Sequence, residues 1–248
     1  SSIKFKINKI FYLASKNVKS SLKEVVLGYY FWIIASFFII TLAKTFIFSN
    51  LLNVDAVEYF FYLSFFLAIW QFLNNCIVSS LNIFFRNQLP LNFQINPFEL
   101  ISIKYVEYLI HFLVKFFIIF IFNIFFNKIN FLILIDNILI FFFICYCLTI
   151  ISSIIGVFYR DVVQFISSLM QISFFLTPIL WLPILVKSNL VQFLKYNPFY
   201  YIINFFYEGF QFLQIKNENF SLIIFSLFFL ILINIFCIKK LRAIYKFS

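Results

Sequence analysis

The chain has 248 residues, of which 64% are hydrophobic, 24% are aromatic and only 11% are charged. A soluble domain carries about 25% charged residues, so this chain has too few to cover the surface of one. Apolar runs of about 20 residues, each long enough to cross roughly 30 Å of hydrocarbon, recur along most of its length. The composition excludes a water-soluble domain and predicts an all-α polytopic membrane protein, because helices satisfy their own backbone hydrogen bonds in lipid.

The net charge of +10 indicates contact with membrane lipids and no nucleic acid. The basic residues lie mostly near the chain ends and beside apolar runs, where the anionic lipids of the inner leaflet account for them. The chain has three Gly and no Gly-Lys-Ser or Gly-Lys-Thr, so it lacks the loop with which an ATPase holds phosphates. We therefore do not expect it to be its own ATPase.

Few residues offer catalytic or metal chemistry. The four Cys lie inside apolar runs and are typical of small buried side chains. A zinc site needs about four ligands, whereas the chain has one His and no cluster of carboxylates. The single histidine, His111, has only Glu107 as an acid within one helical turn, which is weak support for an enzyme. We expect no catalytic residue, metal or cofactor in this chain.

Residues 1–26 are predicted to form an amphipathic interface helix. Apolar residues share one helical direction, and four lysines lie on the opposite side. A helix of this kind lies in the plane of the membrane interface, whereas a solvated basic tail, the alternative, would not need the apolar stripe. The stripe comprises Ile7, Ile10, Phe11, Ala14, Val18, Leu22 and Val25, and the lysines are Lys9, Lys16, Lys19 and Lys23.

Six apolar segments follow, and the basic residues between them predict the orientation. Lys and Arg gather in the amino-terminal segment, in the second and fourth connections and in the tail at 239–248, and cytoplasmic connections are enriched in these residues. We therefore predict one multi-pass transmembrane domain over 1–248, with both termini cytoplasmic. The predicted spans are 27–49, 57–83, 99–126, 130–157 and 162–186, which fill 27–186, and 219–238.

The connection at 187–218 is long and strongly aromatic, so it is unlikely to lie free in water. We expect it to form one or two short re-entrant helices that dip into the outer interface as a periplasmic gate segment. The alternative is a seventh span, but Asn197-Pro198 and Glu208-Gly209 would interrupt it.

Polar residues inside spans are costly, so three polar helix faces are the main functional signal. They lie on the second, third and fifth spans, and if they converge they line a hydrated translocation route. The alternative is that they are hydrogen-bonded contacts between helices, with Lys104 and Glu107 pairing along one helix. The candidate route residues are Gln71, Asn75, Lys104, Glu107, Tyr108, His111, Lys115, Gln164 and Gln171, supported by Asn74, Ser79, Asn82, Ser167 and Ser168.

Several short motifs occur in one order along the chain. Leu27-Gly28 precedes Trp32, Gln88-Leu89-Pro90-Leu91 precedes Ile110-His111, and three further motifs follow: Gly156-Val157-Phe158-Tyr159-Arg160-Asp161-Val162, Thr177-Pro178-Ile179-Leu180-Trp181 and Asn197-Pro198-Phe199-Tyr200-Tyr201. In this order they resemble the membrane subunit of type-2 ABC exporters that move lipid-linked polysaccharides such as O antigen and capsule. That family often has an Arg about ten residues after the Asn-Pro pair, where this chain has Tyr207.

The resemblance implies a homodimeric permease that works with two copies of a separate ABC ATPase, which binds ATP and Mg. The cargo implied is a lipid-linked polysaccharide exported from cytoplasm to periplasm. By this likeness Arg86, Asn87 and Pro90 would couple to the ATPase, and the start and gate motifs comprise Leu27, Gly28, Trp32, Arg160, Asp161, Pro178, Trp181, Asn197 and Pro198. The alternative is an exporter of small molecules or drugs, whose cavity should be mostly apolar.

Two of these motifs carry physical expectations of their own. Arg160 and Asp161 are expected to form an ion pair at the start of the fifth span, with Asp161 capping its helix near the positive end of the dipole. Pro178 and Pro183 are expected to kink the outer half of that span, for gating or for packing.

Overall fold

The computed structural model describes residues 2–22, 29–86, 96–185, 194, 196–210 and 213. These residues form helices and the turns between them, with no strand among them. The predicted sixth span at 219–238, the tail at 239–248, and Leu27, Gly28, Asn87 and Pro90 lie outside the described residues, as does the side chain of Arg86.

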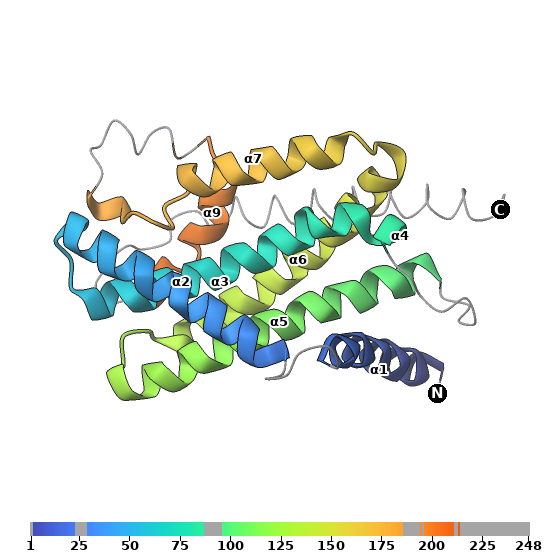
Figure 1. Cartoon of the computed structure of the whole chain (residues 1–248), viewed down its shortest axis with the longest axis horizontal. Coiled ribbons are helices and arrows are strands. Elements are labelled where there is room, and N and C mark those ends of the chain that lie inside the picture. The colour runs from blue at the N-terminus through green and yellow to red at the C-terminus, as the bar shows by residue number, and fades with distance from the viewer. Residues whose placement is uncertain are drawn as a thin grey trace.

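Four described helices are long and apolar enough to cross a membrane, and they match the first four predicted spans. Figure 1 shows α3 between α7 and α5, with α1 beside α5. The elements are α1 (Ser2–Leu22), α2 (Tyr29–Leu52), α3 (Ala56–Ile77), η1 (Ser79–Asn82), α4 (Ile83–Arg86), α5 (Pro97–Phe126), α6 (Phe131–Phe158), α7 (Val162–Leu176), η2 (Pro183–Leu185), α9 (Pro198–Asn204) and η3 (Tyr207–Gly209).

Local sequence explains where the spans begin and end. The Asp55 side chain accepts the backbone N–H of Glu58 at 3.0 Å and caps α3. Pro97 occupies the first turn of α5, where its missing N–H costs nothing. At the other end of α5, Asn127 adopts the left-handed conformation with φ 49°, which Asn tolerates well.

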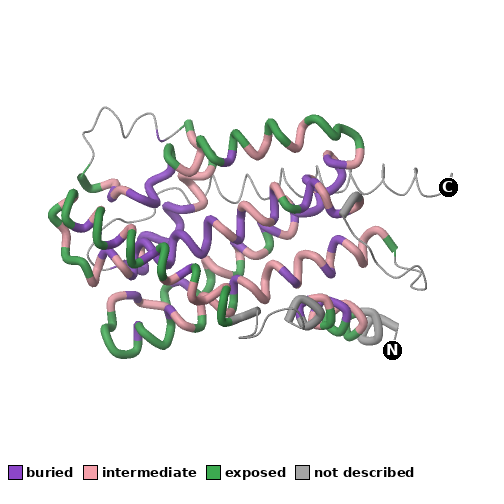
Figure 2. The backbone as a smooth tube through the Cα atoms, viewed as in Figure 1, coloured by how far each residue is buried: buried purple, intermediate pink, exposed green. Residues whose placement is uncertain are grey.

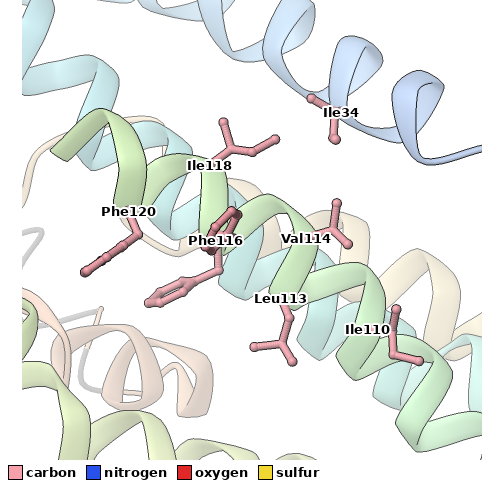
Figure 3. A pocket seen from close by; sticks show the side chains of 8 residues that line it. Ile34, Ile110, Leu113, Val114, Phe116, Ile118 and Phe120 are labelled. Atoms are coloured by element: carbon pink, nitrogen blue, oxygen red, sulfur yellow. The ribbon is translucent and has the colours of Figure 1, made fainter. Parts of the chain in front are cut away.

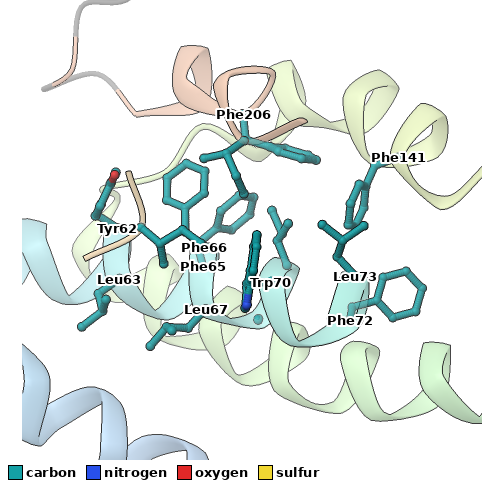
Figure 4. Close-up of a cluster of buried hydrophobic side chains, with 14 of the residues drawn as sticks. Tyr62, Leu63, Phe65, Phe66, Leu67, Trp70, Phe72, Leu73, Phe141 and Phe206 are labelled. Atoms are coloured by element: carbon teal, nitrogen blue, oxygen red, sulfur yellow. The ribbon is translucent and has the colours of Figure 1, made fainter. Parts of the chain in front are cut away.

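Helix α3 is the centre of the fold. It is buried on nearly every side, whereas α2 and α5 each leave one side exposed (Figure 2). Its Phe65 ring packs edge to face with Phe210, with ring centres 5.3 Å apart. Beside it, Phe141 of α6 packs edge to face with Phe206, with ring centres 5.5 Å apart (Figure 4). An aromatic core of this kind fixes α3 against α6 and the segment at 196–210.

The fifth predicted span is shorter than expected, so the prediction of a kinked helix over 162–186 is wrong. Helix α7 stops at Leu176 and has 15 residues, a length of about 22 Å at about 1.5 Å per residue. Thr177 adopts an extended backbone with φ −96° and ψ 135°, as expected for a residue before proline. Pro178 therefore ends the helix, and Pro183 begins the separate turn η2.

The short helices expected within 187–218 are present in its described part, as α9 and η3. Their side chains are buried against the helices: Phe206 and Tyr207 are fully buried, and the Tyr207 ring lies 5.3 Å from that of Phe66. This segment is thus part of the protein core, where its irregular backbone is protected from lipid.

Candidate functional site

The polar faces of α3 and α5 meet inside the bundle. The Lys115 ammonium on α5 donates to the Gln71 side-chain oxygen on α3 at 2.5 Å, and it lies 5.4 Å from the centre of the Phe37 ring on α2. An amide and an aromatic face are both favourable neighbours for a cation, although neither cancels its charge. Two of the candidate route residues are therefore in direct contact.

Glu107 does a different job, because its carboxylate joins α5 to α1. It accepts hydrogen bonds from Asn17 Nδ2 at 2.6 Å and from Lys104 Nζ at 2.8 Å. The predicted pairing of Lys104 with Glu107 is confirmed. A second link, between Lys9 and Glu99, also measures 2.8 Å.

These two links define a parallel register between α1 and α5. Lys9 and Asn17 are eight residues apart, as are Glu99 and Glu107, and Leu13 and Ala14 pack on Ile103 between the links. The face of α1 that packs on α5 thus includes part of the predicted apolar stripe, while Ile7 and Phe11 of that stripe remain exposed.

The remaining candidates on α3 and α5 have packing partners. Tyr108 lies against the aromatic core, and His111 is half-buried on the same helix. Asn75 accepts a hydrogen bond from the Ser79 hydroxyl at 3.4 Å, beside the point where α3 changes to the 3-10 turn η1. These are local or packing contacts, whereas the polar links between helices are those of Lys115 with Gln71 and of Glu107 with Asn17.

The polar face of α7 does not join the other two. Gln164, Ser168 and Gln171 are exposed, and within the described part of the chain no hydrogen bond joins their side chains to α3 or α5. At about 100° per residue, these three lie within about 60° of one another, while Met170, the buried residue of α7, points away from them. The adjacent exposed sector of α7 is apolar and comprises Phe165, Leu169, Ile172 and Leu176, and the exposed Phe175 follows Gln171 on the polar side in the last turn.

The turn that follows α7 is held by tyrosine hydroxyl groups. Tyr59 donates to the Leu180 carbonyl and Tyr62 to the Pro178 carbonyl, each at 2.5 Å. Tyr207 from η3 donates to the same Pro178 carbonyl at 3.2 Å. Burial raises the pKa of Tyr207 well above its usual value, so its hydroxyl stays protonated and able to donate.

Asn197 joins two of the gate motifs through both ends of one amide. Its oxygen accepts the Phe199 N–H at 3.0 Å and caps α9, and its nitrogen donates to the Thr177 hydroxyl at 2.9 Å. Nearby, the Trp181 indole donates to the Phe175 carbonyl at 3.1 Å. Pro198 occupies the first turn of α9, so the predicted gate residues Pro178, Trp181, Asn197 and Pro198 belong to one hydrogen-bonded region.

The remaining motifs have mixed outcomes. Asp161 occupies the position before α7 but makes no capping hydrogen bond, so the predicted cap is wrong: its helical backbone conformation turns the carboxylate from the first turn. Arg160 is exposed at the same bend, and Trp32 is exposed on α2. Gly156 of α6 packs directly on the backbone of Leu81 in η1, which leaves no space for a Cβ atom.

Sequence reasoning missed four residues of this site. Tyr59 and Tyr62 carried a signal, since their spacing places both on one side of α3, but their acceptors lie more than 100 residues away. Tyr207 appeared only as a departure from a family pattern. Lys44 was the clearest omission, because a lysine in an apolar span is unusual by itself; its ammonium lies 5.3 Å from the Phe174 ring of α7.

An apolar groove lies on the exposed side of the bundle, between α2 and α5 (Figure 3). Its volume is about 670 Å³, and only apolar side chains line it, among them Ile34, Ile110, Leu113 and Phe117. It is open along much of its length, so it offers an apolar ligand a shallow surface and no hydrogen-bonding group.

Neither protein-family models nor characterised proteins match the chain.

Proposed function

We propose that this chain is the permease subunit of a type-2 ABC exporter that moves a lipid-linked polysaccharide, of the O-antigen or capsule type, across a bacterial inner membrane. Two copies would work with two copies of a separate ATPase, which binds ATP and Mg. The proposal includes a sixth span at 219–238, cytoplasmic termini, and α1 as an amphipathic helix at the inner interface.

The observation that carries this proposal is the division of α7 into two exposed sectors. Its apolar sector, which includes Leu169 and Ile172, suits lipid. Its polar sector, which includes Gln164 and Gln171, does not, because amides in hydrocarbon lose their hydrogen bonds to water. A water-filled route bordered by α7, with a second copy closing its other side, would satisfy the amides and let them bind sugar hydroxyl groups.

The sequence motifs support the same proposal. Their order resembles that of the exporter family, and the described contacts give several of them a physical purpose. Asn197 connects with Thr177 at 2.9 Å, and Gly156 permits the close approach of η1. The lack of a phosphate-binding loop fits a permease whose ATPase is a separate chain.

Single-cysteine labelling tests the proposed route. In a variant that lacks the four native Cys, Gln171→Cys should react with a water-soluble, membrane-impermeant thiol reagent when the exporter is assembled. The neighbouring Ile172→Cys, in the apolar sector, is the matched control and should stay unlabelled. Equal labelling of the two positions, or no labelling of Gln171→Cys in any transport state, would overturn the proposal that α7 borders a water-filled route.

A second candidate function, export of small apolar molecules, is favoured by the groove between α2 and α5. That groove is lined by apolar residues such as Ile34 and Phe117 and has no polar group for sugar hydroxyls. Polysaccharide export does not need it. Replacing Leu113 on its wall by Trp should block an apolar cargo and leave glycan export intact, so this variant separates the two functions.

A further inference from the structure

Lys44 places an ammonium group within an apolar span. It lies in α2, and its Nζ is 5.3 Å from the centre of the Phe174 ring on α7. Three other lysines are paired with carboxylates: Lys9 with Glu99, Lys104 with Glu107, and Lys128 with Glu58. Lys115 donates to the Gln71 amide instead. Among the residues that the structure describes, no carboxylate pairs with Lys44.

A cation in this position has only partial compensation. An aromatic face attracts an ammonium, but the attraction is weaker than a full countercharge. A charged residue within a span is costly, and it ordinarily faces protein, water or a ligand. Since Lys44 is partly exposed and its aromatic neighbour covers one side only, it can still accept an anion on the open side.

The Phe174 ring that Lys44 contacts lies on α7, the helix that also carries the exposed polar residues. Ser167, Gln171 and Phe174 are spaced by four and three residues, which places them along one stripe of the helix. Because Lys44 lies over Phe174, its ammonium is next to the end of that stripe. The hydroxyl of Ser167 and the amide of Gln171 add neutral hydrogen-bond donors to the charge.

We propose that Lys44, with Gln171 and Ser167, forms a subsite that binds an anionic group of the cargo, either a phosphate or a carboxylate. This inference rests on the proposed function, because it places the subsite on the route beside α7. An ammonium and neutral donors together suit such a group, since hydrogen bonds between charged partners are the strong ones. The subsite would favour acidic cargo over a neutral analogue of the same size.

Binding of matched probe pairs to the purified chain in neutral-lipid nanodiscs tests this subsite. One pair is a long-chain alkyl phosphate and the alcohol of the same chain; the other is an oligogalacturonate and the corresponding neutral oligogalactose. We expect the anionic member of one pair to bind about tenfold more tightly, the scale of one charge-assisted hydrogen bond. The pair that shows the preference identifies the source of the anion, a lipid phosphate or a sugar carboxylate.

The variants assign the preference to Lys44. Lys44→Met should abolish it, and Lys44→Arg, which keeps the charge, should retain it. Lys128→Met is the matched control, because Lys128 lies in a connection and pairs with Glu58 at 3.0 Å. Absence of any preference in the wild-type chain, or an unchanged preference in Lys44→Met, would overturn the inference. Failure of the chain to assemble with an ATPase would overturn the proposed function and leave this binding result unaffected.

Discussion

At the scale of single residues, the gate motifs act through specific hydrogen bonds. The Asn197 side chain both accepts a hydrogen bond, from the first turn of α9, and donates one, to Thr177. Few side chains as short as Asn have both an acceptor and a donor. Thr177 in turn donates to the Ser173 carbonyl at 2.6 Å, so the link continues to the last turn of α7.

Two substitutions should separate the halves of the Asn197 amide. Asn197→Asp keeps the acceptor for Phe199 but loses the donor to Thr177, at a cost of about 1 kcal/mol of stability. Asn197→Ala also loses the cap, which costs about 1 kcal/mol more. Thermal unfolding in detergent should therefore rank wild type above Asn197→Asp and Asn197→Asp above Asn197→Ala. Equal stability of the three proteins would mean that the link to Thr177 contributes nothing.

Gly156 has a steric role that can be tested in the same way. A Cβ atom at this position would overlap the Leu81 backbone, which cannot move as freely as a side chain. Gly156→Ala should destabilise the protein by about 1–3 kcal/mol, the typical cost of overpacking. Val157→Ala, at the next position, adds no atom and is the control. An Ala variant as stable as wild type would show that η1 can shift without cost.

At the scale of helices, α1 packs on α5 through an apolar contact that has a polar contact on either side of it. Lys9 pairs with Glu99, and Asn17 reaches Glu107, which is largely buried. A charge-assisted hydrogen bond to a buried carboxylate is among the stronger polar contacts. Motion of α1 would therefore be transmitted to α5 and to the Lys115 contact further along it.

Removal of the Asn17 amide should loosen this docking. In Asn17→Ala the Glu107 carboxylate loses one of its two donors, with a loss of about 1.5 kcal/mol. Hydrogen exchange of the backbone amides in α1 should then become faster, by roughly tenfold for that loss. Lys16→Ala, on the exposed side of α1, should exchange like wild type. If both variants exchange at the wild-type rate, the contact with Glu107 does not hold the helix.

Composition and local spacing predict much at this scale, and tertiary contacts account for the rest. Long apolar runs gave the first four spans, and the three-residue spacing of Lys104 and Glu107 predicted their pairing. Neither could reveal that Asn17, 90 residues away, shares the same carboxylate. The fifth span was predicted too long because hydropathy continues past Pro178, while the backbone before a proline leaves the helix.

At the scale of the whole molecule, the proposed orientation places the two ends of the bundle on opposite sides of the membrane. Tyr159, in the bend before α7, would be cytoplasmic, and Tyr196, before α9, would be periplasmic; both are well exposed. In a Cys-less variant, Tyr196→Cys should react with an impermeant thiol reagent in intact cells. Tyr159→Cys should react only in inverted membrane vesicles. The reverse pattern would contradict the predicted topology.

The central claim is that this chain is a transport permease whose energy comes from a separate ATPase. The most direct measurement is the composition and ATPase activity of the complex purified from its native membrane through a tag on this chain. The account predicts two copies of the chain with two copies of an ABC ATPase, ATP hydrolysis by the complex, and none by the chain alone. A stable monomer that carries cargo across a membrane without any ATPase would contradict it.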